Sequence, residues 1–131
     1  MVFAGTGEPL LRLDTVLRAA ELIKERRHGV PLRLNTTSLG YDDPEGTLPK
    51  TLQEAGIDTV SIFLPSAEPK QYQALMSATL AVPCTFMSAC ADAELKVRVV
   101  TVAAPDIDVE RIRKLAMSLG AVEFEAKPYK Q

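Results

Sequence analysis

Residues 1–11 read Met-Val-Phe-Ala-Gly-Thr-Gly-Glu-Pro-Leu-Leu, a short apolar stretch followed by a glycine-rich turn. The two glycines allow backbone φ > 0 and a close approach to a ligand. Glu8 then places a carboxylate just after the predicted strand 2–4, at the strand end where open α/β sheets and βα barrels hold their ligands. This stretch is therefore typical of a parallel α/β fold with a ligand site at its first turn.

The rest of the chain repeats the alternation of strand and helix. Strands are predicted at 2–4, 32–35, 59–64, 96–102 and 122–126, and helices at 14–28, 47–55, around 72–76, at 82–93 and at 108–119. Asp14, Thr47 and Asp108 are the residue types that cap helix N-termini. We therefore expect one α/β domain over residues 1–131, with about five mainly parallel strands alternating with helices, equivalent to a partial βα barrel.

The strands alternate between an apolar and a mixed face. The apolar sets are Leu32 with Leu34, Val60 with Ile62 and Leu64, and Val122 with Phe124; the opposing sets are Arg33 with Asn35, Ser61 with Phe63, and Glu123 with Glu125. Side chains two apart on a strand share a face, so the apolar face is expected to pack against helices. The mixed face fits either a ligand-lined concave surface or a face open to solvent.

Composition excludes several classes of protein. The net charge of −2 and the dispersed basic residues give no reason to expect a nucleic-acid partner. No apolar run reaches the roughly 18 residues that a membrane span needs, and no basic signal-peptide region precedes an apolar one. We expect a cytoplasmic protein with no membrane partner.

The residues that could hold a metal or act as catalysts do not form a recognisable set. Cys84 and Cys90 have a spacing that matches no standard zinc or redox motif, and they are expected to be small buried residues. The acids Asp42, Asp43 and Glu45 lie in a turn-rich segment and are expected to be solvated. No catalytic residue and no metal ligand is predicted.

Three segments together resemble the radical S-adenosylmethionine (radical SAM) family, most closely the branch found beside TatD-type nucleases. They are Phe3-Ala4-Gly5-Thr6-Gly7-Glu8-Pro9-Leu10-Leu11, Pro31-Leu32-Arg33-Leu34-Asn35-Thr36, and Val60-Ser61-Ile62-Phe63-Leu64 with Tyr72 downstream. In that branch a G-x-G-E-P turn, an R-x-N-T-N-G strand end and a V-S-x-S-L-N strand end are expected. The resemblance extends along nearly the whole chain.

The resemblance implies a set of residues that bind S-adenosylmethionine (SAM). By position, Gly5, Thr6, Gly7 and Glu8 would contact the methionyl group, whose ammonium needs acceptors. Asn35 and Thr36 would line the neighbouring strand end, and Ser61 lies near the strand end that contacts the ribose in the family. SAM is thus the one cofactor that the resemblance suggests, as a small-molecule ligand.

Other parts of the sequence depart from the family pattern. The family's Cys-x-x-x-Cys-x-x-Cys motif is absent, and two cysteines cannot supply the three thiolates of its iron–sulfur cluster. The expected N-T-N-G reads Asn35-Thr36-Thr37-Ser38, and the expected S-L-N reads Phe63-Leu64-Pro65. As it stands, the chain is expected to be catalytically inactive, without a cluster, and to bind SAM weakly if at all.

Several alternatives remain open at this level. The turn at Glu8 fits a tight connection in which the carboxylate lies at a helix start, where the helix dipole favours it. The scaffold also fits a protein-interaction module, and the unpaired edges of a partial barrel predict a homo-oligomer, a symmetric dimer. A third alternative is a piece of an active radical SAM enzyme whose start was misassigned, with the cysteine motif encoded upstream.

Overall fold

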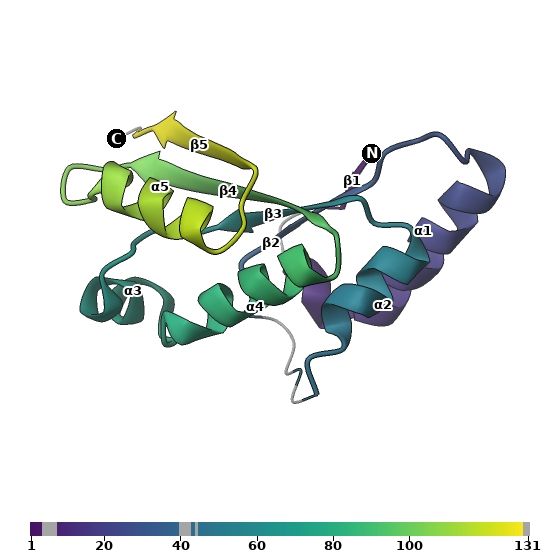
Figure 1. The fold of residues 1–131 in the computed structure, drawn as a ribbon, viewed down its shortest axis with the longest axis horizontal. Coiled ribbons are helices and arrows are strands. Elements are labelled where there is room, and N and C mark those ends of the chain that lie inside the picture. Colours follow the sequence, from purple (N-terminus) through teal and green to yellow (C-terminus); the bar gives the residue numbers. More distant parts are fainter. Residues whose placement is uncertain (4–7, 40–42, 44, 130–131) are drawn as a thin grey trace.

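The computed structural model describes residues 1–3, 8–39, 43 and 45–129. Strands and helices alternate along them (Figure 1). The strands are β1 (Val2–Phe3), β2 (Arg33–Thr36), β3 (Thr59–Phe63), β4 (Lys96–Ala103) and β5 (Glu123–Pro128). The helices are the 3₁₀ helix η1 (Pro9–Arg12) and the α-helices α1 (Leu13–Arg26), α2 (Leu48–Ala55), α3 (Pro69–Met76), α4 (Ala81–Asp92) and α5 (Val109–Ser118).

The five strands form one open, fully parallel sheet in the order β1-β2-β3-β4-β5. This confirms the α/β fold of alternating strands and helices. The register aligns Asn35 of β2 with Ser61 of β3, then with Arg98 of β4 and Glu123 of β5. One row of polar residues therefore crosses the sheet.

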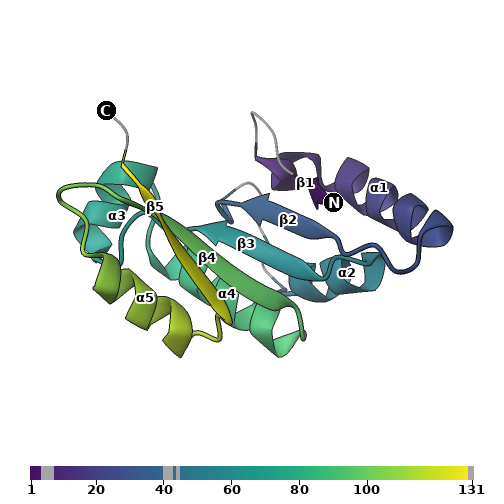
Figure 2. The ribbon, with the colours of Figure 1, turned by 90° about the horizontal axis from the view of Figure 1, so that it is seen from above.

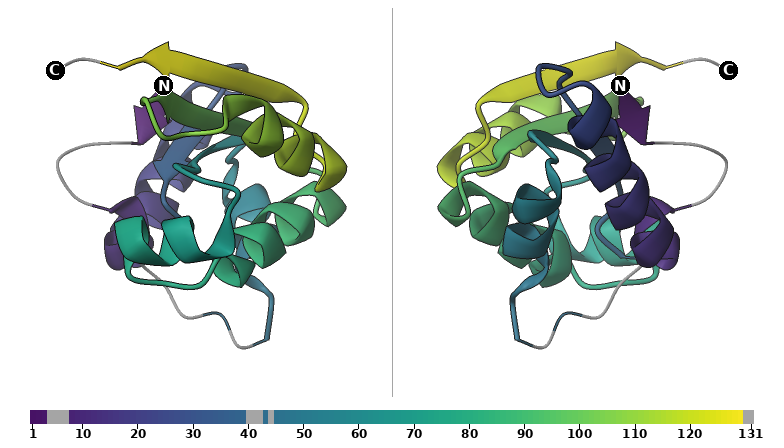
Figure 3. Two further views of the ribbon diagram at one scale, coloured as in Figure 1. Left: turned by 90° about the vertical axis from the view of Figure 1, so that its left-hand side faces the viewer. Right: turned by 90° about the vertical axis from the view of Figure 1, so that its right-hand side faces the viewer.

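The α-helices pack against one face of the sheet. Because connections between parallel strands are right-handed, a strand order that never reverses places successive helices on the same side. Helix α4 contacts β3 and β4, and α5 contacts β4 and β5. In the end views of Figure 3, β5 lies along the top of the molecule and α3 and α4 lie below it. Figure 2 looks onto the strands, and none of the described helices passes in front of β3 and β4.

Strand alternation sorts the side chains as the sequence predicts. The residues fully buried against the helices include Leu34, Val60, Ile62, Val97 and Val99. Burying such side chains stabilises the fold by about 1.5–3 kcal/mol each relative to leaving them exposed. The open face of β2, β3 and β4 carries their alternate residues. Val122 differs from its prediction, since it lies just before β5 and is 60% exposed.

Two of the three predicted helix caps differ in the structure. Asp14 lies within the first turn of α1, whose N-cap position is Arg12 and has no side-chain capping bond, while Glu8 caps the preceding helix η1 through its carboxylate. The Thr47 side chain makes no capping bond, because Asp43 accepts from the Thr47 and Leu48 backbone N–H groups at 3.1 and 2.9 Å. Asp108 caps α5 as predicted by accepting from Arg111 N–H at 3.0 Å.

Within the described residues, no single helix is both long enough and apolar enough to cross a membrane. Helices α3 and α4 reach that length and apolar character only when taken together, and the chain bends by 98° between them.

Candidate functional site

The open face of the sheet contains a hollow of about 580 Å³ that extends from the start of β2 to the carboxyl ends of the strands. Its walls come from the turn after β1 and from β2, β3, β4 and β5. The lining residues are Glu8, Pro9, Arg33, Asn35, Thr36, Thr37, Ser61, Phe63, Arg98, Val100, Val102, Glu125 and Lys127. This hollow is the candidate site, since ligands of open α/β sheets bind at that edge.

Those site residues expected from the sequence that the structure describes all line this hollow. Glu8, Asn35, Thr36 and Ser61 come from three separate segments, and all four line it. Gly5, Thr6 and Gly7 lie outside the described residues.

The Glu8 carboxylate bonds the turn after β1 to the end of β2. One oxygen accepts from the Thr36 hydroxyl and from Leu10 N–H at 3.3 Å. The other accepts from Thr37 N–H at 2.8 Å and from the Thr37 hydroxyl at 2.9 Å. A carboxylate offers about four acceptor positions, so these four bonds account for its capacity. Glu8 thus holds the strand ends together and presents an already hydrogen-bonded carboxylate to the hollow.

Strand β2 supplies two polar atoms without partners. Within the described part of the chain, Arg33 Nε and Asn35 Oδ1 are buried and make no hydrogen bond. Buried polar groups are nearly always satisfied, by protein or by solvent. Both side chains line the hollow, so a bound polar group could form hydrogen bonds with β2 that the described residues do not supply.

A charged network occupies the opposite half of the hollow. Arg98 donates through Nη1 to Ser61 Oγ at 3.1 Å and through Nη2 to Glu125 Oε1. Its Nε also lies 3.5 Å from Glu123 Oε2. Because Ser61 Oγ accepts from the guanidinium, its own proton remains to be donated in another direction.

The role of Arg98 was missed at the sequence level. Arg98 lies on the same strand face as Val100 and Val102. Its alternation with Val97 and Val99 along the strand could have predicted that face. Its partners lie 37 and 27 residues away along the chain, and only the register of the sheet brings them together.

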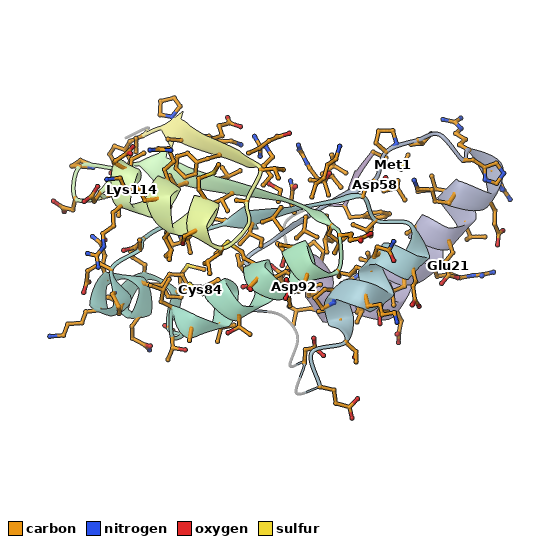
Figure 4. All side chains as sticks on the ribbon, viewed as in Figure 1. Met1, Glu21, Asp58, Cys84, Asp92 and Lys114 are labelled. Atoms are coloured by element: carbon orange, nitrogen blue, oxygen red, sulfur yellow. The ribbon has the colours of Figure 1, made fainter. Side chains whose placement is uncertain are left out.

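The two cysteines lie on the other side of the sheet. Both are on α4, where Figure 4 labels Cys84; Cys90 is fully buried and Cys84 is partly exposed. Burial raises the pKa of the Cys90 thiol to about 12 and raises that of Cys84 as well. Thiols with raised pKa values are poor metal ligands and poor nucleophiles at neutral pH.

A second, smaller cavity of about 310 Å³ lies on the helix side, between α2 and α4. Its walls include Leu48, Pro49, Val82 and Phe86, and they are mostly apolar. Asp43 borders it, but the carboxylate of Asp43 is engaged in capping α2.

Comparisons with known proteins place the fold. A scan against family models gave no match, and neither did a search of curated proteins. Among solved structures, SuiB of Streptococcus suis bound to its precursor peptide SuiA superposes with a TM-score of 0.73 at 17% identity. SuiB bound to S-adenosylmethionine also gives 0.73, and SuiB alone gives 0.72, both at 17% identity. Each match covers 95% of this chain, which spans 27–28% of the SuiB chain. The likeness shows a shared fold.

Proposed function

We propose that this chain is a radical-SAM-like scaffold that binds SAM in the hollow on its open sheet face and does not cleave it by itself. One observation carries the proposal: Glu8, Asn35, Thr36 and Ser61, which the family resemblance selects, line a single hollow. The likeness in fold to SuiB, which has a structure bound to S-adenosylmethionine, supports it.

The residues of the hollow fit the chemistry of SAM. Asn35 Oδ1 is a buried acceptor without a partner, as an ammonium or ribose hydroxyl requires. Ser61 has a proton to donate to a ribose oxygen. Phe63 and Val100 add apolar surface that suits a nucleobase. SAM would supply a sulfonium-activated methionyl and adenosyl group, and these side chains would bind and orient it.

The residues present do not fit the iron–sulfur cluster of the family. Such a cluster is held by thiolates, and the sequence contains two cysteines. Both lie on α4, which contacts the helix-covered side of β3 and β4. The residues of this chain therefore support no redox step through such a cluster.

Titration calorimetry with SAM at millimolar concentrations tests the proposal. The wild-type chain is expected to bind weakly, and Asn35→Ala to weaken binding roughly fivefold by removing one hydrogen bond. Because Asn35 Oδ1 has no partner in the described structure, this substitution should not lower the free energy of unfolding.

Gln53→Ala, an exposed change on α2, is the matched control and should bind SAM like the wild type. Absence of both binding heat and a thermal shift in the wild type would remove SAM binding from the proposal.

A further inference from the structure

Two arginines on the open sheet face have opposite electrostatic surroundings. Arg98 is flanked by the carboxylates of Glu123 and Glu125. Arg33 also lines the hollow, yet among the described residues no carboxylate lies within ion-pairing distance of it, and its Nε–H donor is buried without an acceptor. The charge of Arg98 is therefore balanced by carboxylates, whereas the Arg33 guanidinium keeps a hydrogen-bond donor without a partner among the described residues.

Asn35 places a complementary atom beside Arg33. The two residues are separated by one position on β2, so their side chains share a face and lie about 7 Å apart along the strand. Asn35 Oδ1 is a buried acceptor without a partner, and Arg33 Nε is a buried donor without one. Together they offer a positive donor and a neutral acceptor to the same volume.

A buried donor without an acceptor is costly, and the Arg33 Nε–H group is such a donor on a partly buried side chain. A carboxylate or phosphate on Arg33 would form charge-assisted hydrogen bonds, which are stronger than neutral ones and suit the planar guanidinium. A hydroxyl or N–H group next to the anion would then satisfy Asn35 Oδ1.

We propose that Arg33 and Asn35 form an anion-binding subsite for a carboxylate or phosphate group carried next to a hydrogen-bond donor. The subsite is distinct from the Glu8 turn. Arg33 is the first residue of β2, and Thr36, which bonds to Glu8, is the last, about 10 Å along the strand.

The Glu8 carboxylate orients such a ligand. Glu8 lies at the carboxyl end of β2, whereas the charge of Glu125 on β5 is offset by its ion pair with Arg98. Because Glu8 repels an anion, the negative end of a ligand is directed toward Arg33 at the start of β2.

Nuclear magnetic resonance of the Arg33 side-chain Nε–H group tests this subsite directly. The whole chain is titrated with inorganic phosphate and, separately, with acetate, at constant ionic strength. We expect a saturable shift of the Arg33 Nε–H signal, and the anion that binds more tightly identifies the preferred group. No SAM is present, so failure here leaves the SAM proposal standing, and the reverse also holds.

Two variants separate binding at Arg33 from general attraction to positive charge. Arg33→Gln lacks the Nε–H group, so its titration is followed through the Asn35 side-chain amide signals; it should weaken anion binding by about tenfold or more, because it removes a charged hydrogen bond. Asn35→Asp supplies Arg33 with an internal carboxylate and should weaken binding by a similar factor while Arg33 remains in place.

Arg111→Gln removes the same charge from an exposed position on α5 and should titrate like the wild type. The proposal is overturned if the Arg33 Nε–H signal does not move at saturating phosphate or acetate, or if Asn35→Asp binds either anion as tightly as the wild type.

Discussion

The Tyr72 side chain is fully buried on α3, and its hydroxyl has no hydrogen-bond partner among the described residues. Burial raises its pKa from the ordinary 10.0 to about 12, and the nearby Cys84 adds to the shift. The ring therefore contributes packing, whereas the hydroxyl contributes a desolvation cost. An unsatisfied buried polar group of this kind costs about 1–3 kcal/mol.

Replacing Tyr72 with phenylalanine should therefore leave the free energy of unfolding at pH 7 unchanged or raise it. In the wild type, the tyrosine of the unfolded chain ionises near pH 10 while the folded one stays neutral to about 12. The free energy of unfolding therefore falls as the pH rises from 10 to 12, because only the unfolded tyrosine ionises there. In urea unfolding, the free energy of unfolding of Tyr72→Phe should fall less over that pH range.

Tyr129→Phe is the control, because Tyr129 is 48% exposed and should behave like the wild type. Cys90, whose pKa is also raised to about 12, contributes the same kind of alkaline loss in every variant. A loss of more than about 1 kcal/mol in Tyr72→Phe at pH 7 would show that the hydroxyl has a favourable partner.

At the scale of elements, Asp58 joins three segments at the amino end of the sheet. Its Oδ2 accepts from Leu32 N–H at 2.8 Å and from Lys24 Nζ of α1 at 3.1 Å. Its backbone pairs with Leu32 before β2 and with Lys96 of β4. Figure 4 shows its position. One residue thus fixes how α1, β2 and β4 approach each other.

Asp58→Ala should lower the free energy of unfolding by about 1–2 kcal/mol, since it leaves Leu32 N–H without its acceptor. Asp58→Asn keeps an acceptor for that N–H and loses only the ion pair with Lys24, which is partly exposed and worth about 0–1 kcal/mol. Chemical denaturation of both variants measures the difference. Asp106→Ala, an exposed change with no described side-chain bond, should have no effect, and equal losses in Asp58→Ala and Asp58→Asn would contradict this account.

Much of the arrangement of strands, helices and caps can be predicted from the sequence. The remainder depends on contacts that the sequence does not display. Alternation of Leu34 with Arg33 and Asn35 predicts both the strand and its open face. The Asp108 cap is predicted because the acceptor and the helix are adjacent. The cap of α2 is missed because Asp43 reaches it from four residues before Thr47.

The residues of the candidate site also fall into a predicted group and a group that the sequence does not reveal. Glu8, Asn35, Thr36 and Ser61 were selected by short motifs, and the structure brings them to one hollow. Arg98 belongs to no motif, and its importance comes from the row that it shares with Ser61 and Glu123 across three strands. Such rows are set by strand register, which local sequence does not display.

At the scale of the whole molecule, we propose that two copies pair through β5, the last strand of the described sheet. A two-fold axis requires the two β5 strands to run antiparallel. An axis centred on Ala126 places Glu125 opposite Lys127 of the second copy, and opposite charges across a strand pair are favourable. Both side chains are exposed, and Glu125 would share its carboxylate between Arg98 and the lysine of the second copy.

Light scattering after size exclusion should then give a mass twice that of one chain at micromolar concentration. Lys127→Glu places like charges opposite each other and should shift the protein toward monomer. Lys114→Glu makes the same charge change on α5, where Figure 4 labels it, and should leave the dimer intact. A monomer in the wild type would refute this pairing.

The unbroken strand order β1-β2-β3-β4-β5 has a consequence for how the chain is made. Chains emerge from the ribosome N-terminus first, and folding is faster when partners are close in sequence. Here each newly synthesised strand finds its partner already present as the outer edge of a growing sheet. Among the described strands, none has to be inserted between two that have already paired, so these five can join the sheet in the order in which they are synthesised.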